Sequence, residues 1–430
     1  MTPPSPRDEV TGLLQELIRT DTVNPPGNET RAADVLRRYL ASNDIPCELF
    51  ARVPERANLV ARLPGGDGPS LAFLCHTDTV LADPAEWQRD PWSGDLVDGE
   101  VWGRGALDMK DQVAASAVAF ASLWREEFRP PGDLLFVATA DEEVGEEFGL
   151  EWLVQEHPDA VRCDYAINEG GGERVVLGDR PLYLCAVAEK MSAPFRLRVR
   201  GRSGHASQPN IADNALVKAA RYVEALGAFD PEPQLIPEVE RFLALLLGDV
   251  PSAGDALARA RQAHPLAAEL VEPLLAATVS PTMIEASRKR NVIPATCEVT
   301  VDCRLLPGDT PEDVEPLLRA ALDGGDYELE WIQRAGGTRS PLDTPLWNAL
   351  DQYVQSLEPG ARLAPLACAG FTDSHYLRDA FGTVAYGFFP LRTMDQELVA
   401  RLIHSADERI AVDDLVDGVE ALRFAATHLG

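Results

Sequence analysis

Basic residues are scarce in this chain, and lysine occurs at four positions only. The 430 residues include 69 Asp and Glu against 39 Lys and Arg, which gives a formal net charge of −30. The lysines are Lys110, Lys190, Lys218 and Lys289. A protein that binds nucleic acid or an anionic membrane needs a basic surface. The charge therefore argues against both kinds of partner, and we interpret it as a contribution to solubility.

Long apolar runs and regularly spaced cysteines are also missing. No uninterrupted apolar stretch approaches the ~18 residues that a membrane span needs. The first nine residues contain neither the basic nor the apolar segment of a secretory signal. The seven cysteines are odd in number and irregularly spaced, which fits reduced thiols in a cytoplasm better than a disulfide framework. We therefore expect a cytoplasmic protein without a membrane segment.

The length of the chain and the order of its patterns predict two interleaved domains. A single ordinary core does not accommodate 430 residues. Residues 1–188 alternate helix and strand signals, which favours a doubly wound α/β domain. Residues 189–335 follow the β-α-β-β-α-β order of the ferredoxin-like motif, interrupted by an acidic helical insertion at about residues 229–277. Because the α/β pattern resumes over residues 336–430, an α+β domain is expected inside the α/β domain.

The apolar patterns also predict individual elements. In the α/β domain we expect helices at residues 8–19, 29–43, 113–123 and 345–356, and strands at residues 57–63, 71–75, 134–140, 164–168 and 384–389. In the inserted domain we expect strands at residues 193–201, 278–287, 296–305 and 327–333, and helices at residues 214–226 and 310–322.

Side chains that bind metals follow several of these apolar runs. His76 comes directly after residues 71–75, Glu143 follows residues 134–140, and Glu169 follows residues 164–168. Asp108 lies in a glycine-rich loop before a helix, and His404 lies in the last part of the chain. Ligands of open α/β sheets gather outside the carboxyl ends of the strands. Two imidazoles and several carboxylates gathered there would form a two-metal hydrolytic site.

Each of these residues also has a purely structural interpretation. A lone histidine after a strand is usually a satisfied core residue, and a Glu-Glu pair such as Glu142-Glu143 is usually a solvated turn. The joint pattern favours a site, because Asp78 lies two residues after His76. In an extended chain this spacing places both side chains on one face, where the Asp78 carboxylate could orient the imidazole.

The motifs resemble those of a known family. In order, they are Asn24-Pro25-Pro26-Gly27-Asn28-Glu29, His76-Thr77-Asp78, Gly105-Ala106-Leu107-Asp108-Met109-Lys110, Asp141-Glu142-Glu143-Val144-Gly145, Asn168-Glu169-Gly170, Gly201-Arg202-Ser203-Gly204-His205-Ala206-Ser207, Asn291-Val292-Ile293-Pro294 and His404-Ser405-Ala406-Asp407-Glu408. The chain resembles the dizinc metallopeptidases and deacylases that include aminoacylases, acetylornithine deacetylase, succinyl-diaminopimelate desuccinylase and glutamate carboxypeptidase. It looks most like the carboxypeptidase S branch. The resemblance covers nearly the whole chain and implies a mixed-sheet zinc-peptidase catalytic domain with a lid.

The resemblance implies a ligand set and a base. Asp108 would bridge two metals, with His76 and Glu169 on one and Glu143 and His404 on the other. Nitrogen and carboxylate ligands without a thiolate suit two zinc ions and would also accept cobalt or manganese. A water between the metals would attack the substrate, with Glu142 as general acid/base, although the sequence does not rank Glu142 against Asp141 for this role. The resemblance also implies a cis peptide bond between Asp108 and Met109.

Four further residues are candidates for substrate binding, and three of them, His205, Asn291 and Arg304, resemble functional positions of the family. His205 would polarise the scissile carbonyl, usually from the lid of a partner subunit, which implies a homodimer through the lid. Asn291 and Arg304 would bind the substrate, and Gly370 would let it approach the backbone. Their structural alternatives are a turn histidine, a surface ion pair at Arg304 and a turn glycine.

The sequence thus predicts a dimetal hydrolase that cleaves a linear amide bond in small peptides or N-acyl amino acids, of the carboxypeptidase or deacylase type. One alternative is a non-catalytic binding protein of the same fold, although no ligand or base is missing. Another is a dimetal aminopeptidase, which generally lacks a lid. Ala286-Ser287 and Met191 depart from the family pattern at lid or cleft positions, which leaves the acyl group and side chain of the substrate open. His375 has no assigned role.

Overall fold

The computed structural model describes residues 5–145, 147–178 and 180–429. The chain divides into two compact units. Unit 1 contains residues Met1–Val187, Ser340–Pro365 and Thr372–Gly430, and unit 2 contains Ala188–Arg339 and Leu366–Phe371. The α+β part is therefore inserted into the α/β part. The boundaries fall close to those expected, except that Leu366–Phe371 groups with unit 2 rather than with the last part of the α/β domain.

Unit 1 is built around a mixed sheet with the strand order β1-β2-β6-β3-β7-β19-β9-β18 and β8 beside β9. Strands β6, β3, β7 and β19 are mutually parallel, whereas β1, β2 and β9 pair antiparallel with their neighbours. The strands are β1 Cys47–Ala51, β2 Ala57–Leu63, β3 Leu71–His76, β6 Leu134–Thr139, β7 Tyr165–Asn168, β8 Arg174–Leu177, β9 Arg180–Glu189, β18 Arg362–Cys368 and β19 Val384–Gly387. A separate small sheet contains β4 Asp95–Val97, β5 Glu100–Trp102 and β20 Arg409–Ala411.

Helices cover both faces of this sheet, which confirms the expected α/β architecture. They are α1 Pro6–Ile18, α2 Thr30–Ala41, α3 Lys110–Arg125, α4 Leu150–Glu156, α5 Pro158–Val161, α11 Pro345–Leu357, α12 Ser374–Phe381, α13 Gln396–Leu402 and α14 Val412–Thr427. On β3, Phe73 and Cys75 join the core beneath α1, α3 and α14, whereas Ala72 and Leu74 join the core beneath α4 and α12. Successive side chains of a strand point to opposite faces, so a continuously apolar run is what a strand covered on both faces requires.

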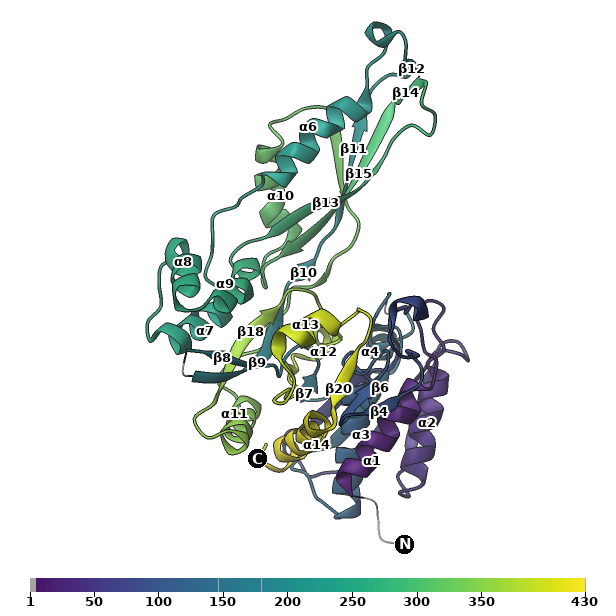
Figure 1. The fold of residues 1–430 in the computed structure, drawn as a ribbon, viewed down its shortest axis with the longest axis vertical. Coiled ribbons are helices and arrows are strands. Elements are labelled where there is room, and N and C mark those ends of the chain that lie inside the picture. The colour runs from purple at the N-terminus through teal and green to yellow at the C-terminus, as the bar shows by residue number, and fades with distance from the viewer. Residues whose placement is uncertain (1–4, 146, 179, 430) are drawn as a thin grey trace. The chain divides into compact units, whose positions relative to one another are not determined.

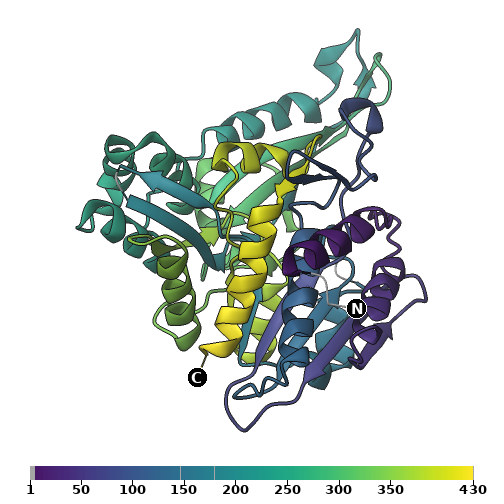
Figure 2. The same cartoon turned by 60° about the horizontal axis from the view of Figure 1, so that its bottom comes forward.

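The two ends of the chain meet in unit 1. The C-terminal helix α14 packs against the N-terminal helices α1 and α3, as Figures 1 and 2 show. Helix α1 begins at a proline in its first turn, where the missing N–H costs nothing, and Ser5 caps it by accepting a hydrogen bond from the backbone N–H of Asp8. Residues from both halves of the sequence therefore build one core.

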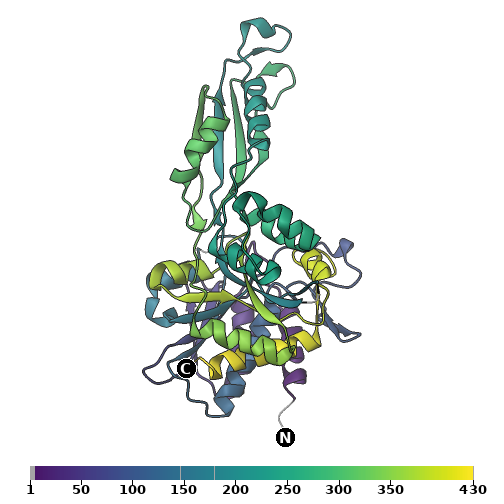
Figure 3. The ribbon, with the colours of Figure 1, turned by 90° about the vertical axis from the view of Figure 1, so that its left-hand side faces the viewer.

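Unit 2 contains the element order β11-α6-β13-β15-α10-β16, which is the expected ferredoxin-like order. Its sheet has the order β16-β11-β15-β10-β17, with β13 paired to β15, and the long strands run side by side (Figure 3). The strands are β10 Met191–Ser192, β11 Phe195–Arg200, β13 Thr278–Glu285, β15 Thr296–Leu305, β16 Tyr327–Trp331 and β17 Ala335–Gly336, with a ribbon of β12 Gly204–His205 and β14 Val292–Ile293. Helices α6 Ala215–Gly227 and α10 Pro311–Ala321 share one core with this sheet.

The expected insertion is helical, with α7 Pro237–Leu247, α8 Ala253–Ala263 and α9 Pro265–Val271. Several boundaries differ from the expectation. The strand expected over residues 384–389 ends at Gly387, and the helix expected over residues 113–123 extends over Lys110–Arg125. Lys110 is polar yet buried, because its ammonium donates to the carbonyl oxygens of Leu17 and Thr20. A pattern that counts only apolar residues leaves out this first turn.

Gly172 marks a close approach between two backbone segments of unit 1. It follows β7 at a φ of +114°, and its carbonyl accepts a hydrogen bond of 2.9 Å from the N–H of Leu391. A Cβ atom at this position would lie 1.7 Å from the carbonyl oxygen of Phe389. Only glycine fits here without moving the backbone that carries Glu169.

We expect Gly172→Ala to lower the free energy of unfolding by more than about 3 kcal/mol, because it combines backbone strain with overpacking. Gly382→Ala is the matched control, since Gly382 has a φ of +70° but nothing within 4 Å of its ideal Cβ; its cost should be about 1 kcal/mol. Urea denaturation measures both values. Equal losses would show that the close approach has no effect.

Candidate metal centre

The five candidate ligands converge at one edge of the unit 1 sheet. His76 is the last residue of β3, Glu169 follows β7, and Glu143 lies in the loop after β6. These three strands are parallel neighbours, so their carboxyl ends meet at the same edge. Asp108 lies just before α3, and His404 lies just after α13.

The ligand atoms form two groups that share Asp108. His76, Asp108 and Glu169 form one group, and Asp108, Glu143 and His404 form the other, with the atoms of each group within 4.8 Å of one another. The Nε2 atom of His76 lies 3.2 Å from Asp108 Oδ1 and 3.7 Å from Glu169 Oε2. The Nε2 atom of His404 lies 2.9 Å from Asp108 Oδ2 and 3.3 Å from Glu143 Oε2. The two oxygens of Asp108 thus face different groups, which is the geometry of a bridging ligand.

The two imidazoles lie in a strongly negative environment. Burial alone would lower the pKa of His76, but the charge of Glu169 and hydrogen bonds to carboxylates raise it well above its ordinary value. Hydrogen bonds to Asp108 and Glu143 raise the pKa of His404 to about 10. Burial also raises the pKa of Glu169, to about 7. Such a cluster attracts cations.

The residues present fit two divalent metal ions. The donor set is imidazole nitrogen and carboxylate oxygen, which suits zinc, cobalt or manganese. The Oε1 atom of Glu143 is buried and has no hydrogen-bond partner among the residues that the structure describes, as a carboxylate reserved for a metal would be. The Asp108–Met109 peptide bond is cis, as the resemblance implies.

Asp78 connects the histidine of one group to the loop that carries Glu143. It is fully buried, and its Oδ1 atom lies 3.4 Å from Nδ1 of His76. Its oxygens also accept hydrogen bonds from the backbone N–H groups of Glu142 and Glu143, at 3.2 and 3.1 Å. The same Nδ1 lies 3.2 Å from the backbone carbonyl oxygen of Asp78. An acceptor on the far nitrogen of a metal-binding histidine, whether carbonyl or carboxylate, fixes the orientation and tautomer of the ring.

The loop Asp141-Glu142-Glu143 is held by a buried ion-pair network. Arg56 donates to both oxygens of Glu29, at 2.5 and 2.7 Å, and to Asp141 Oδ1 at 2.6 Å. Asn24 donates to Asp141 at 2.8 Å and to Asp78 at 2.9 Å. This network holds Asp141 in a left-handed backbone conformation with a φ of +67°.

The same network separates the roles of two neighbouring acids. One oxygen of Asp141 accepts from Arg56 and Asn24, and the other accepts from the N–H of Phe148. Glu142 instead faces the ligand cluster, with Oε2 4.0 Å from Nε2 of His76. Burial and repulsion from Glu169 raise the pKa of Glu142 well above its ordinary value. Glu142 thus faces the ligand cluster, whereas both oxygens of Asp141 are engaged in the supporting network.

A second buried pair supports the Asp108 loop. Arg104 donates to Glu408 at 2.6 Å, and Glu408 accepts from the N–H groups of Gly105, Leu107 and Asp108 at 3.1, 2.7 and 3.1 Å. Arg56 and Arg104 were not predicted as supporting residues, because a single arginine in a loop has no diagnostic spacing. Glu29 and Glu408 lie within the quoted motifs, but the motifs did not predict their ion-pair partners.

The substrate-binding candidates lie mainly in unit 2. His205 and Asn291 are neighbours on the β12–β14 ribbon, where the N–H of Ala206 donates to the carbonyl of Asn291, and both are exposed. Arg304 on β15 forms a two-pronged ion pair with Asp302, at 3.0 and 3.1 Å. Apart from its chain neighbours, no atom of the described residues lies within 4 Å of the ideal Cβ of Gly370, so a side chain would fit there. In unit 1, His375 is buried, and its Nδ1 lies 2.7 Å from the carbonyl oxygen of Thr372.

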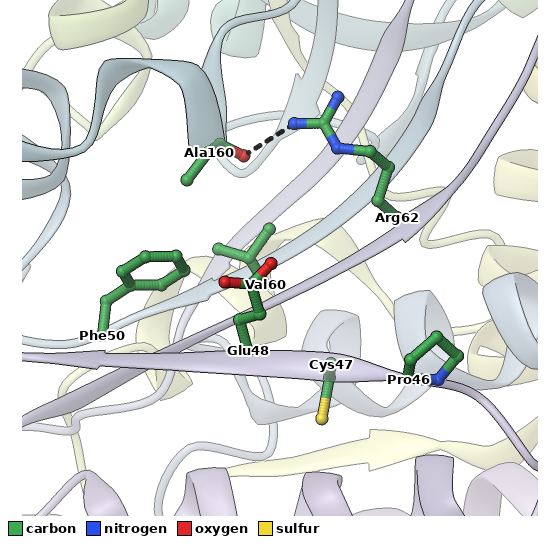
Figure 4. Close-up of a pocket in the computed structure, with 7 residues that line it drawn as sticks. All are labelled: Pro46, Cys47, Glu48, Phe50, Val60, Arg62 and Ala160. Carbon is green, nitrogen blue, oxygen red and sulfur yellow. Dashed lines mark hydrogen bonds between the residues drawn. The ribbon is translucent and has the colours of Figure 1, made fainter.

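Another cavity of unit 1 lies at the β1 edge of the sheet and holds none of the candidate residues. Figure 4 shows its lining, which consists of Pro46, Cys47, Glu48, Phe50, Val60, Arg62 and Ala160. Arg62 donates to the carbonyl of Ala160 at 3.3 Å. Burial raises the pKa of the Cys47 thiol, which disfavours a reactive thiolate. The metal centre therefore remains the candidate site.

We expect Arg56→Met to lower the free energy of unfolding by about 3–5 kcal/mol, because it leaves the buried Glu29 carboxylate unpaired. Arg38→Met is the control, since the ion pair of Arg38 with Glu16 is exposed and should contribute about 0–1 kcal/mol. Denaturant unfolding of both variants measures the difference. A loss below about 1 kcal/mol for Arg56→Met would show that the network does not stabilise the fold.

Comparisons with known proteins identify the family and the fold of the chain. Residues 72–428 match the model of peptidase family M20/M25/M40. A succinyl-diaminopimelate desuccinylase from Rhodospirillum centenum is 29% identical over 424 residues, covering 94% of this chain and 93% of the relative. A desuccinylase of the same name from a Caulobacter species is 27% identical over 429 residues, covering 97% and 96%. Among solved structures, an M20 family metallo-carboxypeptidase from Sulfolobus solfataricus superposes with a TM-score of 0.75 at 17% identity, covering 98% of this chain and 99% of that one. Human carnosine dipeptidase 1 gives a TM-score of 0.66 at 18% identity, covering 98% and 96%. The family predicted from the motifs is confirmed: the chain belongs to peptidase family M20/M25/M40.

Proposed function

We propose that this M20 hydrolase uses two metal ions, zinc in the first instance, to cleave a linear amide bond in small peptides or N-acyl amino acids. The observation that carries the proposal is the pair of ligand groups that share Asp108, with the non-ligating Glu142 beside them. Two divalent cations bound there would act as Lewis acids on the attacking water and the scissile carbonyl.

The protein's own residues supply the proton transfers. Glu142 takes the proton of the attacking water and returns it to the leaving nitrogen, which needs a carboxylate that is not itself a ligand. Asp78 fixes the His76 ring and, through two backbone N–H groups, the position of the Glu142 loop. Burial excludes water and strengthens these interactions.

Residues of unit 2 are proposed to recognise the substrate. Arg304 binds Asp302 through Nε and Nη2, and a guanidinium carries five N–H donors. Its Nη1 group can therefore contact the carboxylate of a substrate. His205 would polarise the scissile carbonyl, Asn291 would add a hydrogen bond, and Gly370 would leave room beside the backbone.

The experiment is a screen of the purified, zinc-loaded protein against N-acyl amino acids and dipeptides, followed by two isosteric variants on the best substrate. We expect Glu142→Gln to keep two metal equivalents and to lose about 10²- to 10⁴-fold in turnover. We expect Glu143→Gln to lose a metal equivalent, since Glu143 is a ligand. Metal analysis and initial rates measure both.

Four results would contradict the proposal. Normal turnover in Glu142→Gln would show that Glu142 is not the base. Loss of a metal in that variant would show that Glu142 is the ligand and Glu143 the base. No hydrolysis of any substrate by the zinc-, cobalt- or manganese-loaded protein would favour a binding protein of the same fold. Cleavage restricted to substrates with a free amine would favour an aminopeptidase.

We also propose that unit 2 forms a homodimer. Met283 and Ile284 on the edge strand β13, and Val217 on the neighbouring helix α6, are each more than half exposed. An apolar edge strand is a natural surface for association. Sedimentation should show a dimer for the native chain and for Leu81→Glu, a control at an exposed apolar residue of unit 1. The double variant Met283→Glu/Ile284→Glu should be monomeric, and a dimer that survives both changes would place the interface elsewhere.

A further inference from the structure

A second recess of unit 1 lies beside the metal ligands. Asp108 and Glu169 form part of its wall, and its volume is about 150 Å³, far more than the ~10–15 Å³ that admits one water. The first turn of α3, the loop after β7, the segment that follows β19 and the helix α13 enclose it. Its apolar lining consists of Leu107, Met109, Phe389, Leu391, Val399 and Ile403. An aliphatic group attached to a substrate at the metal centre would fit these walls.

Two polar side chains that line this recess each have one atom without a partner among the described residues. Asp111 and Gln112, on the first turn of α3, are 3% and 2% exposed. The Asp111 Oδ1 and Gln112 Nε2 atoms are buried without a hydrogen-bond partner among the described residues. Leaving a buried polar atom unpaired costs about 1–3 kcal/mol. Neither residue is a candidate metal ligand. The free-energy cost of their unpaired atoms therefore indicates that a polar group of a bound small molecule contacts them.

The charge of the recess indicates what that group is. Asp111 and Glu173 both carry carboxyl groups, and the lining that the structure describes includes no lysine, arginine or histidine. Burial raises the pKa of both carboxyl groups, that of Asp111 well above its ordinary value. Burial therefore favours the neutral acid, and a cation bound beside Asp111 would favour the carboxylate instead. The Gln112 amide can turn either its NH₂ group or its carbonyl oxygen to the ligand.

We infer that this recess binds an aliphatic ammonium group carried by the substrate, as on a lysine-type side chain, with the methylene chain along the apolar wall and the ammonium at Asp111. The inference rests on the proposed function in one respect, namely that the ligand is a substrate of the amidohydrolase. It adds a specificity site to that function. The ammonium supplies the donor that Asp111 Oδ1 lacks and offsets the cost of burying the carboxylate, as a charged hydrogen bond does.

Binding of small amines tests the site without catalysis. Calorimetric titration of the metal-loaded protein with n-pentylamine, pentan-1-ol and pentanamide compares a cation with two neutral analogues of similar length. We expect the amine to bind about tenfold or more tightly than either neutral compound. This preference should persist in Asp98→Asn, an exposed aspartate of unit 1, and fall to about twofold or less in Asp111→Asn.

The outcomes separate the alternatives. An amine that binds Asp111→Asn as tightly as the native protein contacts the metals or the surface, and overturns the inference. Stronger binding of pentanamide than of the amine overturns the charge assignment and therefore the proposal. Glu173→Gln is a second variant that should weaken the amine preference by a smaller factor, and it keeps the test open if Asp111→Asn does not fold.

Catalysis then distinguishes this site from the proposed function. The ratio of kcat/KM for N-acetyl-lysine to that for N-acetyl-norleucine, or for 6-aminohexanoyl-alanine to that for hexanoyl-alanine, should exceed about ten in the native enzyme. One of these ratios should fall toward one in Asp111→Asn. Hydrolysis of all four substrates without an amine preference would refute the site and leave the function intact. An amine that binds at Asp111 to an enzyme that hydrolyses none of them would refute the function and leave the site as a binding site.

Discussion

The buried carboxylate of Asp78 is the contact on which the arrangement of the metal centre depends. It lies beside Nδ1 of His76 and accepts backbone N–H groups from Glu142 and Glu143. Burial opposes its ionisation, but the hydrogen bonds from His76 and Asn24 lower its pKa below the ordinary value. The Asp78 carboxylate thus orients His76, which belongs to the first ligand group. It also holds the loop that carries Glu142, the proposed base, and Glu143, which belongs to the second group. A neutral residue at this position would leave two strand ends without a common anchor.

Two buried ion pairs near Asp78 contact loops rather than strands. Arg56 and Glu29 hold the loop after β6, while Arg104 and Glu408 hold the loop before α3. Buried pairs are weak evidence for stability as such. Here each pair also receives hydrogen bonds from, or donates them to, the residues that lead to a candidate ligand. Their effect is to fix loop backbones that have no regular ladder of hydrogen bonds to hold them.

Much of the architecture could be predicted from the sequence because burial leaves a pattern. The apolar runs at residues 57–63, 71–75 and 296–305 are strands with nearly the expected bounds, and the ferredoxin-like order of unit 2 follows from its alternation. The helices α12 and α13 were not predicted, because 8 and 7 residues are too few for a periodic pattern to stand out. The roles of Arg56 and Arg104 were not predicted for a different reason. A side chain that acts through one partner distant in the sequence leaves no local pattern.

The sequence alone determined the fold class, the family and the set of candidate ligands, since these depend on residue types in a fixed order along the chain. Only the tertiary structure decided which oxygen of Asp108 faces which group, and that Asp141 binds Arg56 while Glu142 faces the ligands. It also decided that Asp111 and Gln112, which each have a buried atom without a partner among the described residues, line a recess beside the site. The physical reason is distance along the chain: these contacts join residues that lie far apart in the sequence, and a carboxylate acquires its role from the neighbours that folding brings within hydrogen-bond reach.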